Sequence, residues 1–353
     1  MSTVAIVGAG FMGSAMTWPL SDNGHQVRLV GTYLDGEIIA ACRKDRWHPK
    51  LRRTLPEGVK PFFVGELEEA LQGVDLIVQG VSSPGVRWAA ETLAPHLEPT
   101  VPVLAITKGL ALADDGSLCL LPDYFNSLLP ERIRGQVPLA AVGGPCIAGE
   151  LAGRRPTCVV FAGREEALLQ TLVPIFRTTY YHIGTSSDLE GVETCAALKN
   201  VYTAGIALAS GLLEAAGGPG EAGAHMHNLA AALFAQASLE MERLVELMGG
   251  DSRRVHGLPG VGDMYVTCQG GRTVRIGTLL GSGLSLAQAL DRLAGVTLES
   301  VEAIRILAQA LPRLERAGRL GSDELPFLRH LCEIVAQEKP ARLPLEHFFS
   351  DSR

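Results

Sequence analysis

Residues 3–32 read TVAIVGAGFMGSAMTWPLSDNGHQVRLVGT, and this stretch decides the fold of the first half of the chain. The apolar run 4–7 is typical of a buried parallel strand. Three glycines follow in the spacing G-x-G-x-x-G, then a segment with helical character and a second apolar run at 27–30. A lone glycine motif is a weak signal. Placed between a strand and a helix in a unit of about thirty residues, it indicates a dinucleotide-binding domain.

The three glycines of this turn are Gly8, Gly10 and Gly13. Glycine permits a tight turn and lets the backbone approach a pyrophosphate, whose charge the following helix N-terminus attracts. The alternative is a glycine-rich turn that only packs a helix on a sheet. We favour the first interpretation and predict that the N-terminal part of the chain binds a nicotinamide dinucleotide.

Strand-like runs separated by helical patterns continue through the first half of the chain. Four of them lie at 74–81, 101–110, 137–144 and 157–163. Such alternation predicts a doubly wound parallel sheet. A last strand and a connection fall within 180–193, after which long helical patterns dominate. We therefore predict an α/β protein, with a Rossmann-like dinucleotide-binding domain over 1–187 and an all-α substrate-binding and catalytic domain over 188–353.

Composition narrows the class of protein. The chain has 353 residues, 47% of them hydrophobic and 20% charged, with a formal net charge of -7. These values are typical of a globular protein, and without a basic cluster they argue against a nucleic-acid partner. The sequence opens without the basic region and cleavage site of a signal peptide, and we find no uninterrupted apolar run that would span a bilayer. We expect a cytoplasmic protein without membrane insertion.

Cysteine and histidine usage argues against disulfides and metal sites. The seven cysteines are widely spaced and form no C-x-x-C pair, as expected for reduced thiols. His225 and His227 lie two residues apart in a glycine-rich segment and lack a third ligand at metal-binding spacing. We predict no metal.

A single charged side chain stands out in the second half. Between the ends of residues 193–212, Lys199 is the only charge among small and apolar residues. A buried ammonium group is costly unless it is paired. Asp263, the only acidic residue of the glycine-rich stretch 257–283, is the candidate partner. The pair would serve either as a proton donor with its supporting carboxylate or as a structural ion pair between a loop and a helix.

Five motifs, taken together and in order, resemble the soluble NAD(P)-dependent glycerol-3-phosphate dehydrogenases over nearly the whole chain. They are GAGFMGSA (8–15), TKGL (107–110), GGPCIAGEL (143–151), AALKNVYTAGIA (196–207) and GVGDMYVTCQGGRT (260–273). The resemblance implies that the protein interconverts sn-glycerol 3-phosphate and dihydroxyacetone phosphate. It also implies a phosphorylated substrate and a homodimer.

The resemblance assigns roles to individual residues. Lys199 would be the catalytic acid/base, Asp263 would set its protonation state, and Lys108 would lie near the reacting end of the substrate. This agrees with the chemistry, because hydride addition to a ketone leaves an alkoxide that needs a proton donor and nearby positive charge. The implied substrate-binding residues are Lys108, Asn200, Thr267, Arg272 and Thr273. The implied cofactor-binding residues are Gly8, Gly10, Phe11, Met12, Gly13, Thr32, Ser82, Lys108, Ala148, Arg272 and Glu299.

Three positions depart from the family pattern. Thr273 stands where relatives usually have asparagine, and Ala230 and Gln236 stand where they have basic residues. If those groups hold the phosphate, the substrate could be another small polyol phosphate, such as a four-carbon one, or an unphosphorylated hydroxy compound. A nucleotide-sensing protein without turnover is a further alternative, against which the retained Lys108 and Lys199 argue.

The choice between NAD and NADP stays open. No acidic residue stands at the tip of the second predicted strand to bind the ribose hydroxyls. Thr32 could accept a 2'-phosphate, but no arginine follows it directly. We slightly favour NAD.

Overall fold

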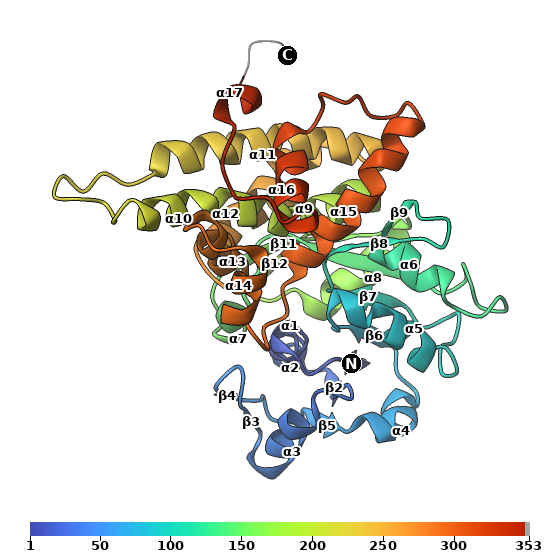
Figure 1. Cartoon of the computed structure of the whole chain (residues 1–353). Coiled ribbons are helices and arrows are strands. Elements are labelled where there is room, and N and C mark those ends of the chain that lie inside the picture. The colour runs from blue at the N-terminus through green and yellow to red at the C-terminus, as the bar shows by residue number, and fades with distance from the viewer. Residues whose placement is uncertain (350–353) are drawn as a thin grey trace. The chain divides into compact units, whose positions relative to one another are not determined.

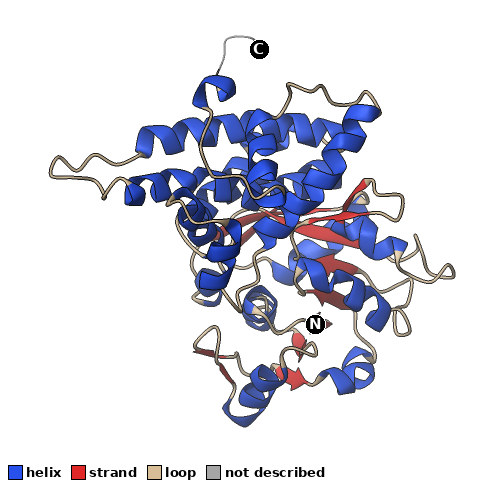
Figure 2. Cartoon of the chain, viewed as in Figure 1, coloured by secondary structure: helices blue, strands red, loops and turns tan. Residues whose placement is uncertain are grey.

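The chain forms two compact units in a computed structural model that describes residues 1–349 (Figure 1). The first unit comprises residues 1–108 and 120–193, and the second comprises 109–119 together with the chain from Thr194 onward. This division differs from a single cut near residue 187, because the segment 109–119 joins the helical unit. Most strands belong to the first unit, while the second is nearly all helical (Figure 2).

The first unit is built on an eight-stranded sheet with the order β12-β11-β10-β7-β6-β1-β2-β5. From β5 to β10 all neighbours run parallel, in the order typical of dinucleotide-binding sheets. β11 runs antiparallel to β10, and β12 runs parallel to β11, which the apolar runs did not predict. The strands are β1 (Thr3–Val7), β2 (Gln26–Val30), β5 (Lys60–Phe62), β6 (Leu76–Gln79), β7 (Val103–Ala105), β10 (Leu139–Gly143), β11 (Thr157–Ala162) and β12 (Tyr181–Ser186).

Helices and one small hairpin complete this unit. The helices are α1 (Phe11–Ala15), α2 (Thr17–Asp22), α3 (Gly36–Asp45), α4 (Leu67–Leu71), α5 (Val86–Leu93), α6 (Leu121–Ser127), α7 (Ala148–Ala152) and α8 (Glu166–Phe176). The hairpin pairs β3 (Trp47–His48) with β4 (Arg53–Thr54). Along the chain, α3 and this hairpin connect β2 to β5.

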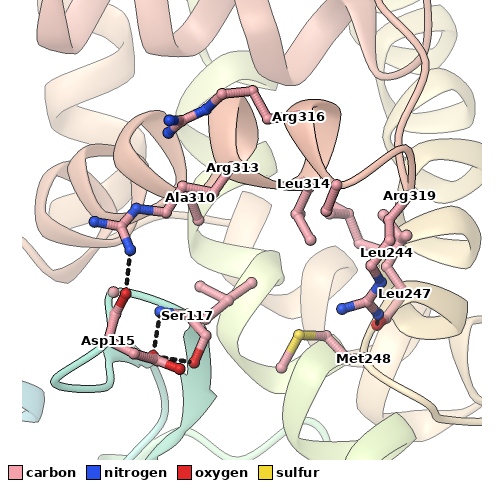
Figure 3. A pocket seen from close by; sticks show the side chains of 13 residues that line it. Asp115, Ser117, Leu244, Leu247, Met248, Ala310, Arg313, Leu314, Arg316 and Arg319 are labelled. Carbon is pink, nitrogen blue, oxygen red and sulfur yellow. Dashed lines mark hydrogen bonds between the residues drawn. The ribbon is translucent and has the colours of Figure 1, made fainter.

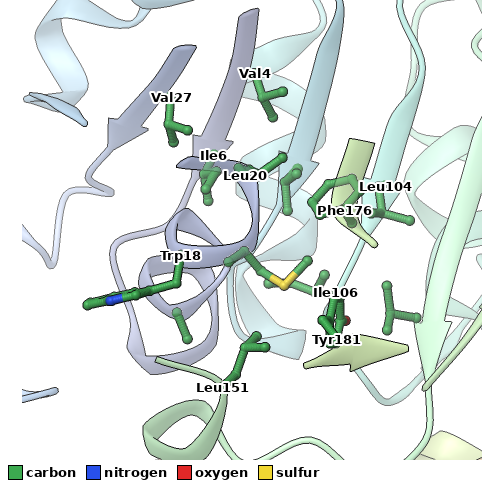
Figure 4. Close-up of a cluster of buried hydrophobic side chains, with 14 of the residues drawn as sticks. Val4, Ile6, Trp18, Leu20, Val27, Leu104, Ile106, Leu151, Phe176 and Tyr181 are labelled. Carbon is green, nitrogen blue, oxygen red and sulfur yellow. The ribbon is translucent and has the colours of Figure 1, made fainter. Parts of the chain in front are cut away.

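Alternate side chains of the central strands enter two different cores. Leu104 and Ile106 belong to a large cluster that also contains Leu20 and Phe176 (Figure 4). Ala105, between them, belongs to a small cluster formed with other alanines and with Leu189 and Val192 at the start of α9. This is the two-residue period of a strand buried on both faces. The small alanines allow α9 to approach the sheet closely.

The second unit consists of helices and one hairpin. The helices are α9 (Leu189–Ile206, whose first turn lies in the first unit), α10 (Leu208–Ala215), α11 (His227–Leu247), α12 (Asp263–Cys268), α13 (Arg272–Gly281), α14 (Leu286–Arg292), α15 (Glu299–Arg316), α16 (Pro326–Ala336) and α17 (Leu345–Phe348). The hairpin pairs β8 (Leu110–Leu112) with β9 (Leu118–Leu120).

Glycines bring α13 into backbone contact with α9 and α10. A Cβ added at Gly277 would lie 2.1 Å from the Ala204 carbonyl oxygen, and one at Gly281 would lie 2.3 Å from that of Leu208. Any side chain at these positions would force the helices apart. In the same unit, Asp263 at the start of α12 contacts Lys199 on α9.

An arginine fastens the hairpin 109–119 to the second unit. Arg313 on α15 donates to the backbone carbonyl of Asp115, and a Cβ at Gly116 would overlap its guanidinium. A cavity of about 700 Å³ lies beside this contact and is also lined by Leu244 and Met248 of the α11 region (Figure 3). None of the residues predicted to bind substrate or cofactor lines this cavity.

One stretch, Leu189–Ala215, has the length and hydropathy of a membrane-spanning helix, although the charged Lys199 interrupts its apolar run. Its most apolar window is 78% buried inside the protein. Burial of this extent is what the core helix of a globular fold shows.

Candidate active site

The glycine turn lies where the strand order of the sheet reverses, between β1 and β6. Gly8 follows β1 with φ of 117°, and a Cβ there would lie 2.6 Å from the Gly80 carbonyl oxygen at the end of β6. A Cβ on Gly13 would lie 2.1 Å from the Gly8 carbonyl oxygen. Both glycines are therefore required by the close packing of the turn itself. In sheets of this order, ligands bind beyond the carboxyl ends of the strands at this point.

Gly10 differs from its two neighbours in the motif. A Cβ added to Gly10 meets no atom within 4 Å, and its φ of -71° is one that any residue adopts. Among the described residues, nothing accepts a hydrogen bond from the Gly10 N–H. The protein's own packing does not explain this glycine, whereas the approach of a ligand does. The site thus fits a dinucleotide.

Asp35 is an acidic residue close to the end of β2, where we expected none. It lies five residues beyond the strand, is 6% exposed, and turns its carboxylate toward the glycine turn. Its Oδ2 accepts hydrogen bonds from Ala9 N at 3.2 Å, from Thr32 N at 2.9 Å and from Thr32 Oγ1 at 2.8 Å. The Thr32 hydroxyl hydrogen is therefore engaged within the protein. The only sequence signal for this role was an acidic residue soon after the second strand.

The predicted cofactor-binding residues divide between the two units. Phe11, beside the turn, is 55% exposed, which is unusual for a large apolar side chain. Ser82 directly precedes the short 3-10 helix Ser83–Gly85 after β6. Nine of the predicted residues lie in the first unit: Gly8, Gly10, Phe11, Met12, Gly13, Thr32, Ser82, Lys108 and Ala148. Arg272 and Glu299 lie in the second.

Lys108 and Glu193 form the second polar feature of the first unit. Lys108 Nζ donates to the Gly144 carbonyl oxygen at 2.9 Å. Glu193, on α9, is 1% exposed, and neither carboxylate oxygen has a hydrogen-bond partner among the described residues. Burial raises the pKa of Glu193 to about 8, while the charge of Lys108 lowers this pKa and that of Asp123 raises it. Glu193 is therefore mostly protonated at neutral pH.

This burial makes stability depend on pH, which Glu193→Gln tests. The pKa is higher in the folded chain than its ordinary value of 4.5, so the folded state alone holds the proton between these values. The stability that the protonated Glu193 contributes is complete below pH 4.5 and is lost progressively as the pH rises from there to about 8. Glutamine does not titrate. We expect parent and variant to melt alike near pH 5 and the variant to be more stable at pH 8, by roughly 3–5 kcal/mol. Melting temperatures across this range check the result, and a difference that is constant with pH would contradict it.

In the second unit, Lys199 and Asp263 meet as the sequence suggested. Lys199 Nζ lies 2.5 Å from Asp263 Oδ1, with the lysine side chain 12% exposed and the aspartate fully buried. Asp263 is the first residue of α12, and Thr267, one turn later, donates its hydroxyl to the Asp263 carbonyl oxygen at 2.6 Å. Asn200, 8% exposed, directly follows the lysine on α9. The ammonium group thus has a buried carboxylate partner, and the lysine side chain that carries it keeps a small exposed fraction.

Arg272 lies at the start of α13 and is paired. Its Nη2 donates to Glu299 Oε2 at 2.6 Å, and the arginine side chain is 43% exposed. Thr273, next to it, is 6% exposed. The Arg272 side chain is therefore both paired with Glu299 and substantially exposed.

Gln236 has a structural role that the sequence did not indicate. It is 2% exposed and donates from Nε2 to Glu240 at 2.8 Å. Glu240 also accepts from the Tyr202 hydroxyl and from the N–H groups of Phe327 and Leu328 at the start of α16. Gln236 is thus part of a buried network, whereas Ala230 is half-buried.

Within residues 1–349, no group of three or more His, Cys, Asp or Glu side chains is arranged to hold a metal ion.

Known protein families match most of the chain. Residues 3–169 match the model for the NAD-dependent glycerol-3-phosphate dehydrogenase N-terminus, and residues 188–346 match that for the C-terminus. The chain is 37% identical over 290 residues to the NADP(+)-dependent glycerol-3-phosphate dehydrogenase of Archaeoglobus fulgidus, covering 82% of this chain and 83% of that protein. The chain belongs to this family.

Two further members of the glycerol-3-phosphate dehydrogenase family support the assignment. The glycerol-3-phosphate dehydrogenase [NAD(P)+] of Geobacter metallireducens is 30% identical over 344 residues, which cover 96% of this chain and 94% of that one. The crystal structure of the glycerol-3-phosphate dehydrogenase of Coxiella burnetii aligns with a TM-score of 0.80 and 25% identity, over 98% of this chain and 97% of that one. The predicted α/β fold with a helical C-terminal domain is thereby confirmed.

Proposed function

We propose that this chain interconverts sn-glycerol 3-phosphate and dihydroxyacetone phosphate with NAD or NADP. The observation that carries the proposal is the Lys199–Asp263 pair, with a nitrogen-to-oxygen distance of 2.5 Å, a fully buried carboxylate and a lysine side chain that is still 12% exposed. A purely structural ion pair does not need any exposure of the lysine side chain. Membership of the family supports the cofactor class and the phosphorylated substrate.

Lys199 would move the proton of the reaction. The bound nicotinamide nucleotide supplies the hydride that adds to the substrate carbonyl carbon. As the carbonyl oxygen gains negative charge, Lys199 Nζ would donate its proton there and become a neutral amine, and in the reverse direction it would accept this proton. Asp263 would favour the charged form between turnovers, because a nearby carboxylate stabilises an ammonium.

The remaining predicted residues would bind and orient the substrate. Lys108 would supply positive charge near the reacting oxygen, while Asn200 and Thr267 would hydrogen-bond the hydroxyl groups. Arg272 would hold the phosphate, since a guanidinium can donate two parallel hydrogen bonds to it. Thr273 would contribute its hydroxyl where relatives have an amide. We retain the homodimer and the cytoplasmic location as predictions.

An assay of NADH and NADPH oxidation against a panel of ketones tests this proposal. The panel contains dihydroxyacetone phosphate, a four-carbon keto-phosphate and unphosphorylated dihydroxyacetone. We expect the highest kcat/KM on dihydroxyacetone phosphate. Preference for another compound would support the alternative substrates suggested by Thr273 and Ala230. Cofactor binding without turnover on any of them would indicate a sensor instead.

A further inference from the structure

The backbone around Ala9, inside the glycine turn, is held by two side chains from distant parts of the chain. Ala9 N–H donates to Asp35 Oδ2 at 3.2 Å, and the Ala9 carbonyl oxygen lies 3.1 Å from His48 Nε2. Ala9 and His48 are both fully buried. His48 comes from β3, 39 residues along the chain from Ala9.

The hydrogen bonds of His48 define its tautomer. The Leu51 N–H donates to His48 Nδ1 at 3.0 Å, so this nitrogen carries no proton. A neutral imidazole has one donor and one acceptor, and therefore Nε2 bears the proton and donates it to the Ala9 carbonyl. The same Nε2 lies 2.9 Å from the buried Ser14 hydroxyl oxygen on α1. The ring thus links the turn to the helix that follows it.

Fixing the Ala9 carbonyl also fixes the direction of the Gly10 N–H. In a planar trans peptide the carbonyl and the following N–H point in opposite directions. The bond from His48 therefore turns the Gly10 N–H away from the imidazole. Asp35 holds the preceding peptide in the same manner through the Ala9 N–H. Both peptide planes that flank Ala9 are thus set before any ligand arrives.

We propose that His48 and Asp35 are positioning residues that preorganise the glycine turn for the cofactor pyrophosphate. The inference rests on the proposed cofactor binding and extends it to two residues outside the set predicted to bind the cofactor. A preset turn spares the ligand the cost of ordering it, which raises affinity. The same turn would receive NAD and NADP alike, because both carry the pyrophosphate.

Acid should disrupt this arrangement. Protonation would make Nδ1 of His48 a donor that faces the Leu51 N–H, which is also a donor. Burial and the charge of Lys50 lower the pKa of His48 from its ordinary 6.5, while Asp35 and the hydrogen bond to Ala9 oppose this shift. The neutral imidazole of His48, which makes these hydrogen bonds, therefore prevails at pH 7 and is lost only as the pH falls through a value below 6.5.

Calorimetric titration of the full chain with NAD+ and NADP+ between pH 5 and 8 tests the proposal. For the parent we expect Kd to be constant at high pH and to rise, by up to about tenfold per unit, below the pKa of the imidazole. His48→Gln should bind about three- to tenfold more weakly at pH 7.5 and lose this acid dependence. His25→Gln is the matched control. His25 accepts from Ser2 N–H before β1, at the strand end opposite the turn, and should leave the parental profile unchanged.

A second pair of variants covers the case in which His48→Gln does not fold. Asp35→Asn keeps an oxygen acceptor and should stay within about threefold of the parental Kd, whereas Asp35→Ala should weaken binding about tenfold or more. Parental affinity in Asp35→Ala, or an unchanged acid profile in folded His48→Gln, would overturn the proposal while leaving the function intact. Failure of the parent to bind either nucleotide would instead refute the proposed function.

Discussion

Replacing Lys199 by methionine is expected to slow hydride transfer by about 10²–10⁴-fold, the usual effect of losing a proton-transfer group. Methionine is also long and unbranched, so it can fill the same space along α9. Cofactor binding should persist, because the glycine turn belongs to the other unit. Single-turnover transfer from NADH or NADPH to dihydroxyacetone phosphate measures the loss.

The double variant Lys199→Met with Asp263→Asn is the control for stability. The single substitution leaves the fully buried Asp263 carboxylate without its lysine, and breaking a buried pair in this way costs about 3–5 kcal/mol. Removing both charges should recover much of that stability. If the pair is catalytic, the double variant remains slow although it is stable. The catalytic assignment would be wrong if the folded single variant transferred hydride at the parental rate, or if the double variant regained that rate.

A carboxylate at Gly10 should nearly abolish dinucleotide binding. A side chain there meets no protein atom within 4 Å, and the backbone conformation suits any residue, so Gly10→Asp should fold. The new charge would face the pyrophosphate at short range. We expect a rise in Kd of about 10²-fold or more, as repulsion of a few kcal/mol implies. Titration with NADH and NADPH, together with the melting temperature, gives the result.

Two other variants separate charge from size and from folding. Gly10→Ala adds the Cβ without the charge and should weaken binding much less than the aspartate does. Gly13→Ala should instead lower the melting temperature, because its Cβ would lie 2.1 Å from the Gly8 carbonyl oxygen. If a folded Gly10→Asp protein titrates either nucleotide like the parent, the cofactor does not bind at this turn.

Local patterns predicted those features that depend on neighbouring residues. The run 4–7 and the spacing of the glycines indicated the nucleotide turn, since strand, turn and helix are consecutive there. The isolation of Lys199 in an apolar helix implied a partner, because burying a charge alone is costly. Asp263 was the candidate on composition alone, and the structure places it 2.5 Å away. The family's motifs supplied the reaction class.

Contacts between distant residues were decided only by the tertiary structure. No local pattern links His48 to Ala9, because an isolated histidine has no periodicity and its partner is a backbone carbonyl. For the same reason, the sequence could not predict that Gln236 binds Glu240 inside the core. Nor could it predict that Arg313 donates to the backbone of the hairpin 109–119, which belongs to the helical unit. Hydrophobic period and motif spacing determine elements and their order. Which polar groups meet depends on how those elements pack, and packing is a property of the whole chain.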